Sequence, residues 1–405
     1  MKVSVIGLGY IGLPAAALIS GKGIFVHGVD INEKIVGTIN SGRIHFIEPE
    51  LEGLIHHAVS NKLLIADTKP SEADVFIVSV PTPILADNSP DLSYVEKAIG
   101  SIIPYLQKGN LLILESTCPV GTTERMVEMI LTKRPELKGS FFAAYCPERV
   151  LPGNIIHELI NNDRVIGGVD KTSSEKAADF YRQFVNGNMH LTDSRTAEMC
   201  KLVENASRDV SIAFANELSM ICQRAGINTN ELIELANKHP RVNILKPGPG
   251  VGGHCIAIDP WFIVDSFPEE AKLIRQAREV NMSKTEWVIE KISEEAKRFE
   301  NAAGKKPVIA CMGLTYKADV DDIRESPAME IKNQLERSGF SVKAADPLIT
   351  NGIKETIKIF TPEESVSQAD MVVFLVGHKQ FRSLPVPANK IILDFCNINH
   401  QKSIL

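Results

Sequence analysis

Short apolar runs recur through the first third of the chain, each bounded by turn-forming or polar residues. They are rich in valine, isoleucine or leucine and cover residues 2–8, 25–30, 74–80, 110–115 and 141–145. Continuous apolar runs of this length are typical of strands buried on both faces of a parallel sheet. Segments of helix-compatible composition, such as residues 14–20, follow the strands. The pattern predicts a doubly wound α/β domain.

The same rhythm returns in the last third of the chain. Apolar runs at residues 308–314, 340–345 and 369–377 predict three more strands. A helix is predicted to begin at Ser326-Pro327, because proline is tolerated in the first helical turn. The run 340–345 ends at Asp346, as the run 25–29 ends at Asp30. We therefore expect two similar α/β halves.

The middle of the chain has a helical pattern instead. Residues 195–225 and 269–299 contain neither glycine nor proline and are rich in good helix formers, so each predicts a long helix. Residues 231–238 predict a short helix that Pro240 closes. Two long helices between two α/β units are expected to form the core of a homodimer or a larger homo-oligomer.

A loop rich in glycine and proline separates the two long helices. Residues 246–260 place four glycines and two prolines directly before Cys255, with Asp259 four positions later. Such a run disfavours both helix and strand, and its glycines allow backbone to approach a ligand. A thiol on this loop is a candidate nucleophile. The alternative is a turn followed by a buried structural cysteine.

The first βα turn carries a dinucleotide-binding pattern. Gly7, Gly9 and Gly12 form G-x-G-x-x-G between the first strand and helix, and the second strand ends at Asp30. The glycines let a pyrophosphate approach a helix N-terminus, and the carboxylate binds ribose hydroxyls. Because a carboxylate repels a 2′-phosphate, NAD is favoured over NADP. Thr82 and Thr117 follow two further strands and are candidates for the cofactor side, although turn or capping roles would suit them equally.

Composition and net charge narrow the range of possible partners and cofactors. The net charge of −6 gives no reason to expect nucleic acid or an anionic membrane as partner. Seven scattered cysteines without a C-x-x-C pair argue against a disulfide framework or zinc site, and no metal is expected. No apolar run reaches the ~18 residues of a membrane span. We expect a cytoplasmic protein without a membrane partner.

Three further polar groups are candidates for a substrate site, and the last two would also suit a solvated surface. The irregular loop 146–153 holds Glu148 beside Arg149. In the first long helix, Lys201, Asn205 and Arg208 fall on one face. The loop 315–325 supplies Lys317 and Arg324, which suit a diphosphate or sugar hydroxyls.

Together these segments resemble the UDP-glucose/GDP-mannose dehydrogenase family over nearly the whole chain. Residues 146–153 and 252–262 look most like the members that oxidise UDP-N-acetyl-D-mannosamine at C6; UDP-N-acetylglucosamine is the alternative substrate. The resemblance implies two Rossmann-like doubly wound parallel-sheet domains joined by a central helical region. It assigns residues 1–190 to NAD binding, 191–300 to dimerisation and the cysteine loop, and 301–405 to UDP-sugar binding.

The resemblance also implies individual roles. Catalytic roles fall to Cys255 as nucleophile and to Lys201, Asn205, Asp259, Glu148 and Thr117. NAD contacts fall to Gly7, Gly9, Tyr10, Ile11, Gly12, Asp30, Thr82 and Thr117. Contacts to the sugar nucleotide fall to Arg149, Val150, Lys201, Asn205, Arg208, His239, Arg241, Gly252, Tyr316, Lys317 and Arg324. His239 and Arg241 match positions that reach the site across a dimer interface.

The chain departs from the family at one position, because Pro152 stands where many members carry a second acid. A water-positioning role for that carboxylate is therefore not expected. Two other functions remain to be weighed: a two-electron NAD dehydrogenase, which would not need Cys255, and a catalytically silent nucleotide-sugar sensor. A sensor would be expected to have lost Cys255, Lys201 or Asp259, and all three are present.

Overall fold

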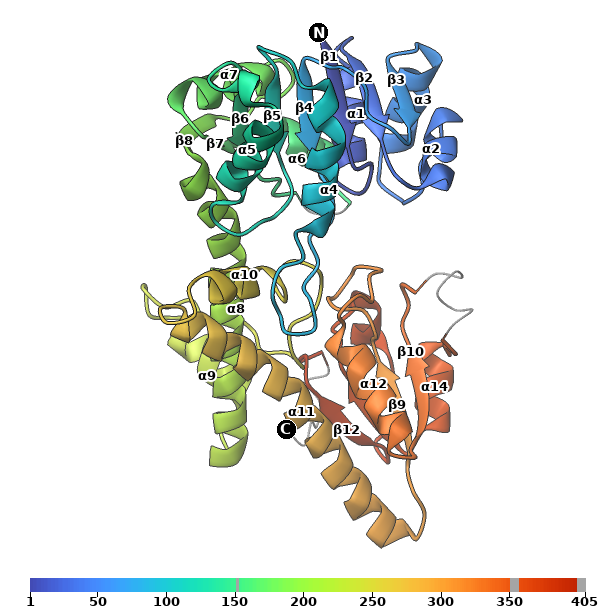
Figure 1. Cartoon of the computed structure of the whole chain (residues 1–405). Coiled ribbons are helices and arrows are strands. Elements are labelled where there is room, and N and C mark those ends of the chain that lie inside the picture. Colours follow the sequence, from blue (N-terminus) through green and yellow to red (C-terminus); the bar gives the residue numbers. More distant parts are fainter. Residues whose placement is uncertain (151–152, 350–356, 399–405) are drawn as a thin grey trace. The chain divides into compact units, whose positions relative to one another are not determined.

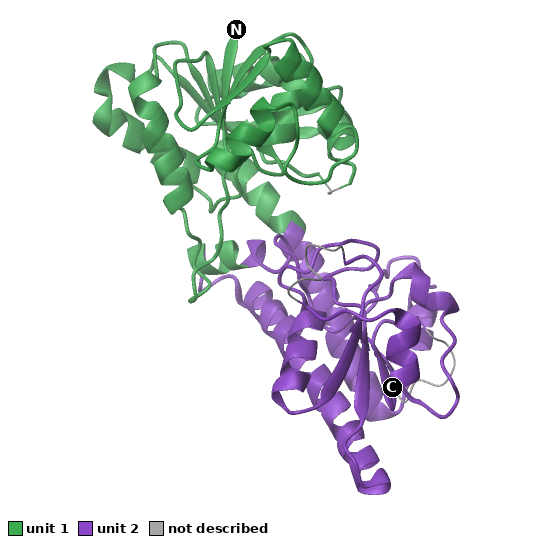
Figure 2. Cartoon of the chain, turned by 90° about the vertical axis from the view of Figure 1, so that its right-hand side faces the viewer, with its two compact units in different colours: residues 1–204, 261–266 green, residues 205–260, 267–405 purple. Residues whose placement is uncertain are grey.

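The computed structural model describes residues 1–150, 153–349 and 357–398. These residues form two compact units, each of which is described by itself below (Figure 2). Unit 1 comprises Met1–Glu204 and Trp261–Ser266, and unit 2 comprises Asn205–Pro260 and the described residues from Phe267 onward. The predicted Pro152 departure lies outside the described residues.

Unit 1 is built on an eight-stranded sheet in the order β3-β2-β1-β4-β5-β6-β7-β8 (Figure 1). The strands are β1 (Lys2–Ile6), β2 (Phe25–Val29), β3 (Leu64–Asp67), β4 (Val75–Val78), β5 (Leu111–Leu114), β6 (Phe142–Tyr145), β7 (Arg164–Gly168) and β8 (Met189–Asp193). Strands β1 to β6 pair in parallel, as the apolar runs predict. Strand β7 pairs with β6 in the antiparallel sense, and β8 runs parallel to β7.

Helices cover both faces of this sheet. They are α1 (Gly12–Ser20), α2 (Glu33–Asn40), α3 (Leu51–Ser60), α4 (Ser93–Ile102), α5 (Thr122–Lys133), α6 (Ile155–Asn161) and α7 (Lys171–Tyr181), with short 3-10 helices η1 (Ile103–Tyr105) and η2 (Pro135–Leu137). Side chains of α1, α3, α6 and α7 share one hydrophobic core with the sheet. Those of α4 and α5 share a second core. Two cores separated by a sheet confirm the doubly wound prediction.

Unit 2 contains a second, smaller sheet with the order β10-β9-β11-β12, in which all pairs are parallel. The strands are β9 (Val308–Met312), β10 (Ser341–Ala345), β11 (Met371–Phe374) and β12 (Ile391–Asp394), accompanied by α12 (Pro327–Arg337), α14 (Pro362–Gln368) and η3 (Lys379–Ser383). Side chains of α11 and α12 pack on one face of the sheet and those of α14 on the other. Ser326 caps α12 by accepting from the N–H of Met329, as the Ser-Pro pair predicts.

The predicted long helices are α8 (Ser194–Ala225) and α11 (Lys272–Ala303), and the shorter helices between them are α9 (Thr229–Ala236) and α10 (Asp259–Ser266). Within unit 2, polar side chains link α8 to α11 through buried hydrogen bonds. Asp209 accepts from Arg278 at 2.6 Å, Asn216 donates to Asn281 at 2.9 Å, and Lys284 donates to Ser219 at 2.8 Å. Each of these six buried side chains thus has at least one hydrogen-bond partner.

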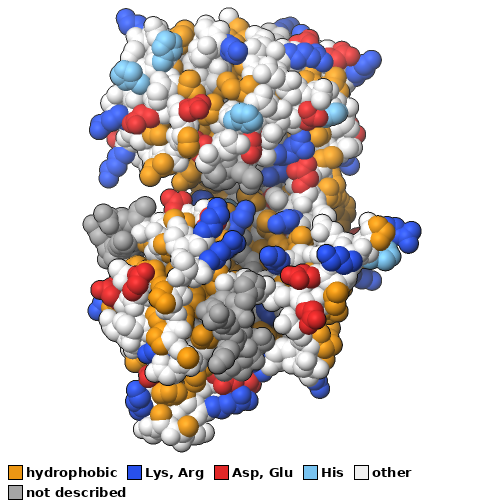
Figure 3. Space-filling view, turned by 180° about the vertical axis from the view of Figure 1, so that it is seen from behind, with side chains coloured by type: hydrophobic (Ala, Val, Ile, Leu, Met, Phe, Trp, Pro, Cys, Tyr) orange, Lys and Arg blue, Asp and Glu red, His pale blue; other side chains and the backbone are white. Residues whose placement is uncertain are grey.

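Charged side chains of both signs are spread over the face of the molecule in Figure 3, with apolar side chains between them. Among the described residues, none of the helices combines the length and the apolar character that crossing a bilayer requires.

Candidate active site

The glycines of the first βα turn occupy positions where a larger residue would not fit. A Cβ on Gly7 would lie 2.3 Å from the Ser79 carbonyl oxygen, and one on Gly12 would lie 1.9 Å from the Gly7 carbonyl oxygen. Gly7 also has a φ of +94°. At Gly9, by contrast, a Cβ would meet nothing within 4 Å, so the backbone there faces open space. This arrangement suits the close approach of a pyrophosphate.

The other residues predicted to contact NAD come from the same edge of the unit 1 sheet. Asp30 follows β2, and its carboxylate accepts from the N–H groups of Leu8 at 3.1 Å and Asn32 at 2.9 Å while staying partly exposed. Tyr10 is exposed, and its ring stacks on Phe46 with centroids 4.3 Å apart. Half-buried positions are held by Ile11, by Thr82 after β4 and by Thr117 after β5. The residues present therefore fit NAD, and their individual contacts with it stay predictions.

Glu148 and Arg149 are both engaged within unit 1. Glu148 is 8 % exposed, accepts from the buried Arg164 guanidinium, and accepts from the Arg149 N–H at 2.7 Å. The Arg149 guanidinium donates to Glu204 at 2.8 Å. Glu115 lies in the same buried region, where desolvation raises its pKa to about 7. Val150, the neighbour of Arg149, packs against the hydrophobic core.

The loop before Cys255 has neither helix nor strand from Val242 to Ile258, as predicted. Cys255 is exposed, whereas Cys118, Cys146, Cys222 and Cys311 are buried. The Cys255 carbonyl accepts from the N–H of Asp259 at 2.8 Å, one turn ahead, where α10 begins. The exposed thiol rules out the alternative of a buried structural cysteine.

Two glycines, Gly252 and Gly253, place this loop against the loop that follows β9. A Cβ on Gly253 would lie 2.8 Å from the Tyr316 ring, and one on Gly252 would lie 2.2 Å from the Glu325 carbonyl oxygen. The Gly253 N–H donates to the Arg324 carbonyl at 3.2 Å. Unit 2 therefore brings together the Cys255 loop, Tyr316 and Arg324, which are far apart in sequence.

Electrostatics of the same region affect His254, which precedes the thiol. Burial lowers the pKa of the His254 imidazole, and the positive charge of Arg324 lowers it further. The neutral imidazole is therefore favoured at physiological pH.

A second polar contact in unit 2 joins the loop to α8. Asn205 donates to Asp259 at 2.6 Å, and Asp259 is only 3 % exposed. Lys201 precedes Asn205 by one helical turn and therefore falls on the same face of α8. Arg208, on the next turn, is exposed. The predicted polar set of Asn205 and Asp259 is thus assembled within one unit.

Other predicted substrate residues stand at the surface. His239 and Arg241 are exposed in the turn after α9, where the Arg241 N–H donates to His239 Nδ1 at 3.3 Å. Lys317 is exposed, and the Arg324 guanidinium forms a two-pronged ion pair with Asp322. The role of His239 and Arg241 across a dimer interface stays a prediction.

The structure adds residues that sequence reasoning missed. Asn216 of α8 accepts from the N–H of Gly248, and Thr285 of α11 donates to the Pro249 carbonyl, both at 2.9 Å. These two bonds hold the start of the Cys255 loop against the long helices. No local sequence signal marks them, because an asparagine and a threonine within a helix are usually solvated.

Comparisons with known proteins match three family models. The NAD-binding domain of the UDP-glucose/GDP-mannose dehydrogenase family matches residues 1–185, its central domain residues 195–283, and its UDP-binding domain residues 310–401.

Individual relatives cover nearly the whole chain. An NDP-N-acetyl-D-galactosaminuronic acid dehydrogenase from Ralstonia nicotianae is 50% identical, covering 97% of this chain and 95% of its own. A UDP-N-acetyl-D-mannosamine dehydrogenase from Escherichia coli is 51% identical, covering 94% of both chains. A solved UDP-D-ManNAc dehydrogenase from Pyrococcus horikoshii superposes with a TM-score of 0.89 at 38% identity, covering 100% of this chain and 97% of its own.

Sequence, fold and site agree with these matches. The open glycine turn with Asp30 accounts for the NAD-binding domain, and the second parallel sheet with its Tyr316 loop lies in the region matched by the UDP-binding domain. The chain belongs to the UDP-glucose/GDP-mannose dehydrogenase family and is an NAD-dependent UDP-sugar dehydrogenase.

Proposed function

We propose that this enzyme oxidises the C6 hydroxyl of UDP-N-acetyl-D-mannosamine to a carboxylate, through a covalent intermediate on Cys255. The observation that carries the proposal is an exposed thiol on a glycine loop that is seated directly on the Tyr316 loop. A two-electron alcohol dehydrogenase has no need of a nucleophilic thiol beside its sugar-nucleotide loop.

The chemistry needs a thiol because the oxidation removes four electrons. NAD, when bound, supplies the hydride acceptor for each of the two oxidation steps. After the alcohol has become an aldehyde, the Cys255 thiolate adds to C6 and forms a thiohemiacetal, whose C–H bond can lose the second hydride. Water then hydrolyses the resulting thioester, which releases the carboxylate and regenerates the thiol.

The polar residues of the proposed site suit supporting roles in this sequence. Lys201 would stabilise the oxyanion that develops at C6, an effect worth about 3 kcal/mol for a single donor in other enzymes. Asp259 or Lys201 would take the alcohol proton, directly or through water. The contact of Asn205 with Asp259 supports an orienting role for the amide. Glu148 and Thr117 would act from the cofactor side.

The relatives support more than one sugar. The mannosamine assignment rests on the loop motifs and on the Escherichia coli relative at 51% identity. The Ralstonia relative at 50% identity supports a second candidate, an N-acetylgalactosamine-type substrate. UDP-N-acetylglucosamine is the third sugar to compare, because it differs from the mannosamine nucleotide only in configuration at C2. Comparing kcat/KM for the three purified UDP-sugars decides among them.

The remaining expectations concern organisation and setting. We propose a division into the three domains 1–190, 191–300 and 301–405, a homodimer as the minimal assembly, and action in the cytoplasm. The exposed apolar side chains Phe214 and Ile221, seven residues apart on α8, support an interface on that helix.

The test of the covalent mechanism is Cys255→Ala. The variant should lose formation of the sugar acid while still binding NAD, because the cofactor turn lies elsewhere in the chain. Cys200→Ala is the matched control, since Cys200 is a half-buried thiol that has no proposed role. Acid formation at the wild-type rate by Cys255→Ala would sink the mechanism.

A further inference from the structure

The two α/β halves repeat one backbone arrangement closely. In unit 1, the Gly7 N–H donates to the Val29 carbonyl and the Ser79 N–H donates to the Ile6 carbonyl, both at 2.8 Å. In unit 2, Gly313 donates to Ala345 at 2.8 Å and Leu375 to Met312 at 2.9 Å. Gly7 and Gly313 have φ values of +94° and +90°. Thr82 lies three residues after Ser79, and His378 lies three residues after Leu375. His378 is therefore the counterpart of Thr82.

The acids at the ends of the second strands behave differently in the two halves. Asp30 accepts from the Leu8 N–H and stays partly exposed. Its counterpart Asp346 accepts from the Leu314 N–H in the same way, at 2.7 Å, but is only 4 % exposed. Asp346 also accepts from Thr315 N–H and lies 3.1 Å from the ring of His378. The position that is open to a ribose in unit 1 is therefore filled by protein in unit 2.

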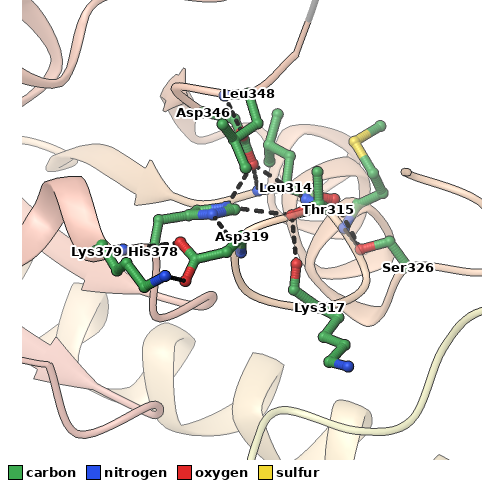
Figure 4. Close-up of polar contacts among 10 residues, drawn as sticks. Leu314, Thr315, Lys317, Asp319, Ser326, Asp346, Leu348, His378 and Lys379 are labelled. Atoms are coloured by element: carbon green, nitrogen blue, oxygen red, sulfur yellow. Dashed lines mark hydrogen bonds and ion pairs between the residues drawn. The ribbon is translucent and has the colours of Figure 1, made fainter. Parts of the chain in front are cut away.

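The side chain of His378 occupies this position. It is completely buried and lies between two segments, with Asp346 on one side and Asp319 on the other (Figure 4). Nε2 is 3.1 Å from Asp346 Oδ2 and 3.1 Å from Thr315 Oγ1, and Nδ1 is 3.1 Å from the Asp319 nitrogen. Because the Asp319 N–H is a donor, Nδ1 must accept and the ring proton sits on Nε2, facing the Asp346 carboxylate.

The same contacts fasten residues 315–319 at both ends. Thr315, fully buried, donates its hydroxyl to the Lys317 carbonyl at 3.0 Å, so its oxygen is left to accept from His378. Asp319 has a φ of +61°, a conformation that needs support in a residue other than glycine. Its carboxylate accepts from the Lys379 N–H at 3.1 Å, directly after His378.

We infer that His378 is a positioning residue for sugar-nucleotide binding: as the Nε2–H tautomer it clamps the segment 315–319, which presents Tyr316 and Lys317 beside the Cys255 loop. The inference rests on the proposed function, in which these two residues hold the substrate. It also explains how the second α/β half differs from the first. Asp346 and His378, which lies four positions after β11, no longer face a ligand but shape the loop that does.

Two near-isosteric variants separate the two ring contacts. His378→Asn keeps an acceptor close to the position of Nδ1 and loses the contact of Nε2 with Asp346. His378→Gln keeps a donor close to the position of Nε2 and leaves the Asp319 N–H without its acceptor. An unsatisfied buried donor costs more than a lost contact whose acceptor has other donors, so the glutamine variant is expected to be the more impaired.

The measurements are the dissociation constant of UDP by calorimetry, and KM for the sugar nucleotide and for NAD. His378→Gln should raise the UDP dissociation constant and the sugar-nucleotide KM by about tenfold, the factor expected for one hydrogen bond. His378→Asn should raise both by a smaller factor. KM for NAD and kcat should stay within about twofold of wild type in both variants.

The inference would be overturned if both variants bound UDP as tightly as wild type, or if His378→Asn weakened UDP binding more than His378→Gln. A parallel rise in KM for NAD would also overturn it. If the histidine variants do not fold, Thr315→Val against Thr315→Ser decides, because only serine keeps the hydroxyl that joins His378 to Lys317. UDP affinity should fall in the valine variant alone, and equal affinity in the two would overturn the clamp. Since UDP binding does not depend on which sugar is oxidised, failure of the proposed substrate leaves this readout intact.

Discussion

At the scale of single residues, Lys284 shows how the fold changes a side chain that looks ordinary in sequence. It lies on α11, is 3 % exposed, donates to Ser219, and its ammonium lies 3.7 Å from the centre of the Trp287 ring. Burial lowers the pKa of Lys284 to about 7. The face of Trp287 attracts a cation and opposes that shift. Burial of the ammonium group therefore lowers the stability of the folded state at neutral pH.

This cost predicts a pH dependence of stability. An unfolded lysine titrates near ~10.4, so the unfolded chain binds more protons than the folded chain between pH 7 and that value. The contribution of Lys284 to stability therefore increases as the pH rises above 7 and is least favourable below it. Lys284→Met removes this dependence, so its stability relative to wild type should fall by up to about 1.4 kcal/mol per pH unit between pH 7 and 9.

Urea unfolding followed by tryptophan fluorescence at several pH values measures this difference. Lys291→Met, on the same helix but at a more exposed site paired with Glu294, should show no such trend. If the stability difference between Lys284→Met and wild type stayed constant between pH 7 and 9, the pKa of Lys284 would not be lowered.

Residue type and spacing were enough to predict Asp30 and the glycine turn, because each is a local requirement of the backbone, whereas they left open whether Cys255 is exposed or buried. They were not enough for Lys284, for the Arg164–Glu148 pair or for His378. Those three depend on burial, which is set by elements far apart in the sequence. Asp346 was noticed as a repeat of Asp30, but its occupied carboxylate could be seen only once His378 was in place.

At the scale of elements, the Cys255 loop is shaped by what it touches. Gly253 has a φ of +84°, and a Cβ there would lie 2.8 Å from the Tyr316 ring, so the ring packs where a side chain would otherwise stand. Gly253→Ala should reduce turnover at least tenfold and raise KM for the sugar nucleotide, because the methyl group displaces Tyr316. The strained backbone should also cost about 1–2 kcal/mol of stability.

Gly304→Ala is the control that separates these two effects. Gly304 ends α11 with a φ of +69°, and a Cβ there would meet nothing within 4 Å. In thermal unfolding, Gly304→Ala should lose about as much stability as Gly253→Ala does, while it keeps wild-type kinetic constants. Equal kinetic losses in the two alanine variants would assign the effect to backbone strain rather than to the Tyr316 contact.

Most elements that the apolar pattern predicts are present, with ends that shift by a few residues. The sequence did not reveal β3 or β12, and it did not reveal β7, β8 or the reversal of direction after β6. Strand β7 ends in two glycines, and β8 at the sheet edge is mostly exposed or half-buried, so neither shows a continuous apolar run. The glycines of β7 are required by packing, since a Cβ on Gly167 would lie 2.2 Å from the Asp193 carbonyl oxygen.

At the scale of the whole molecule, the chain uses one α/β arrangement twice for different purposes. In the first copy Asp30 stays partly exposed, at the position where we expect the ribose of NAD, and in the second copy the equivalent Asp346 is buried against His378. The βα rhythm of the sequence predicts β1, β2, β4, β5 and β6 in the first sheet and β9, β10 and β11 in the second, but not the order of the strands. What the second copy binds could not be derived from that rhythm and came from the family resemblance.

The proposed homodimer can be tested through the exposed apolar positions of α8. Phe214 is 56 % exposed and Ile221 is 55 % exposed, and both fall on one face of the helix. Phe214→Glu with Ile221→Glu should shift the mass measured by light scattering from a dimer to a monomer, because unpaired charges would be buried. Leu191→Glu, at an exposed apolar position on β8, should leave the mass unchanged.

The central claim is a four-electron oxidation that passes through Cys255. Its most direct measurement is the amount of NADH formed when limiting UDP-N-acetyl-D-mannosamine is consumed completely by the wild-type enzyme with excess NAD. The account predicts two NADH for each sugar nucleotide, with the uronic acid as the product. One NADH for each sugar nucleotide, with an aldehyde as the product, would contradict it.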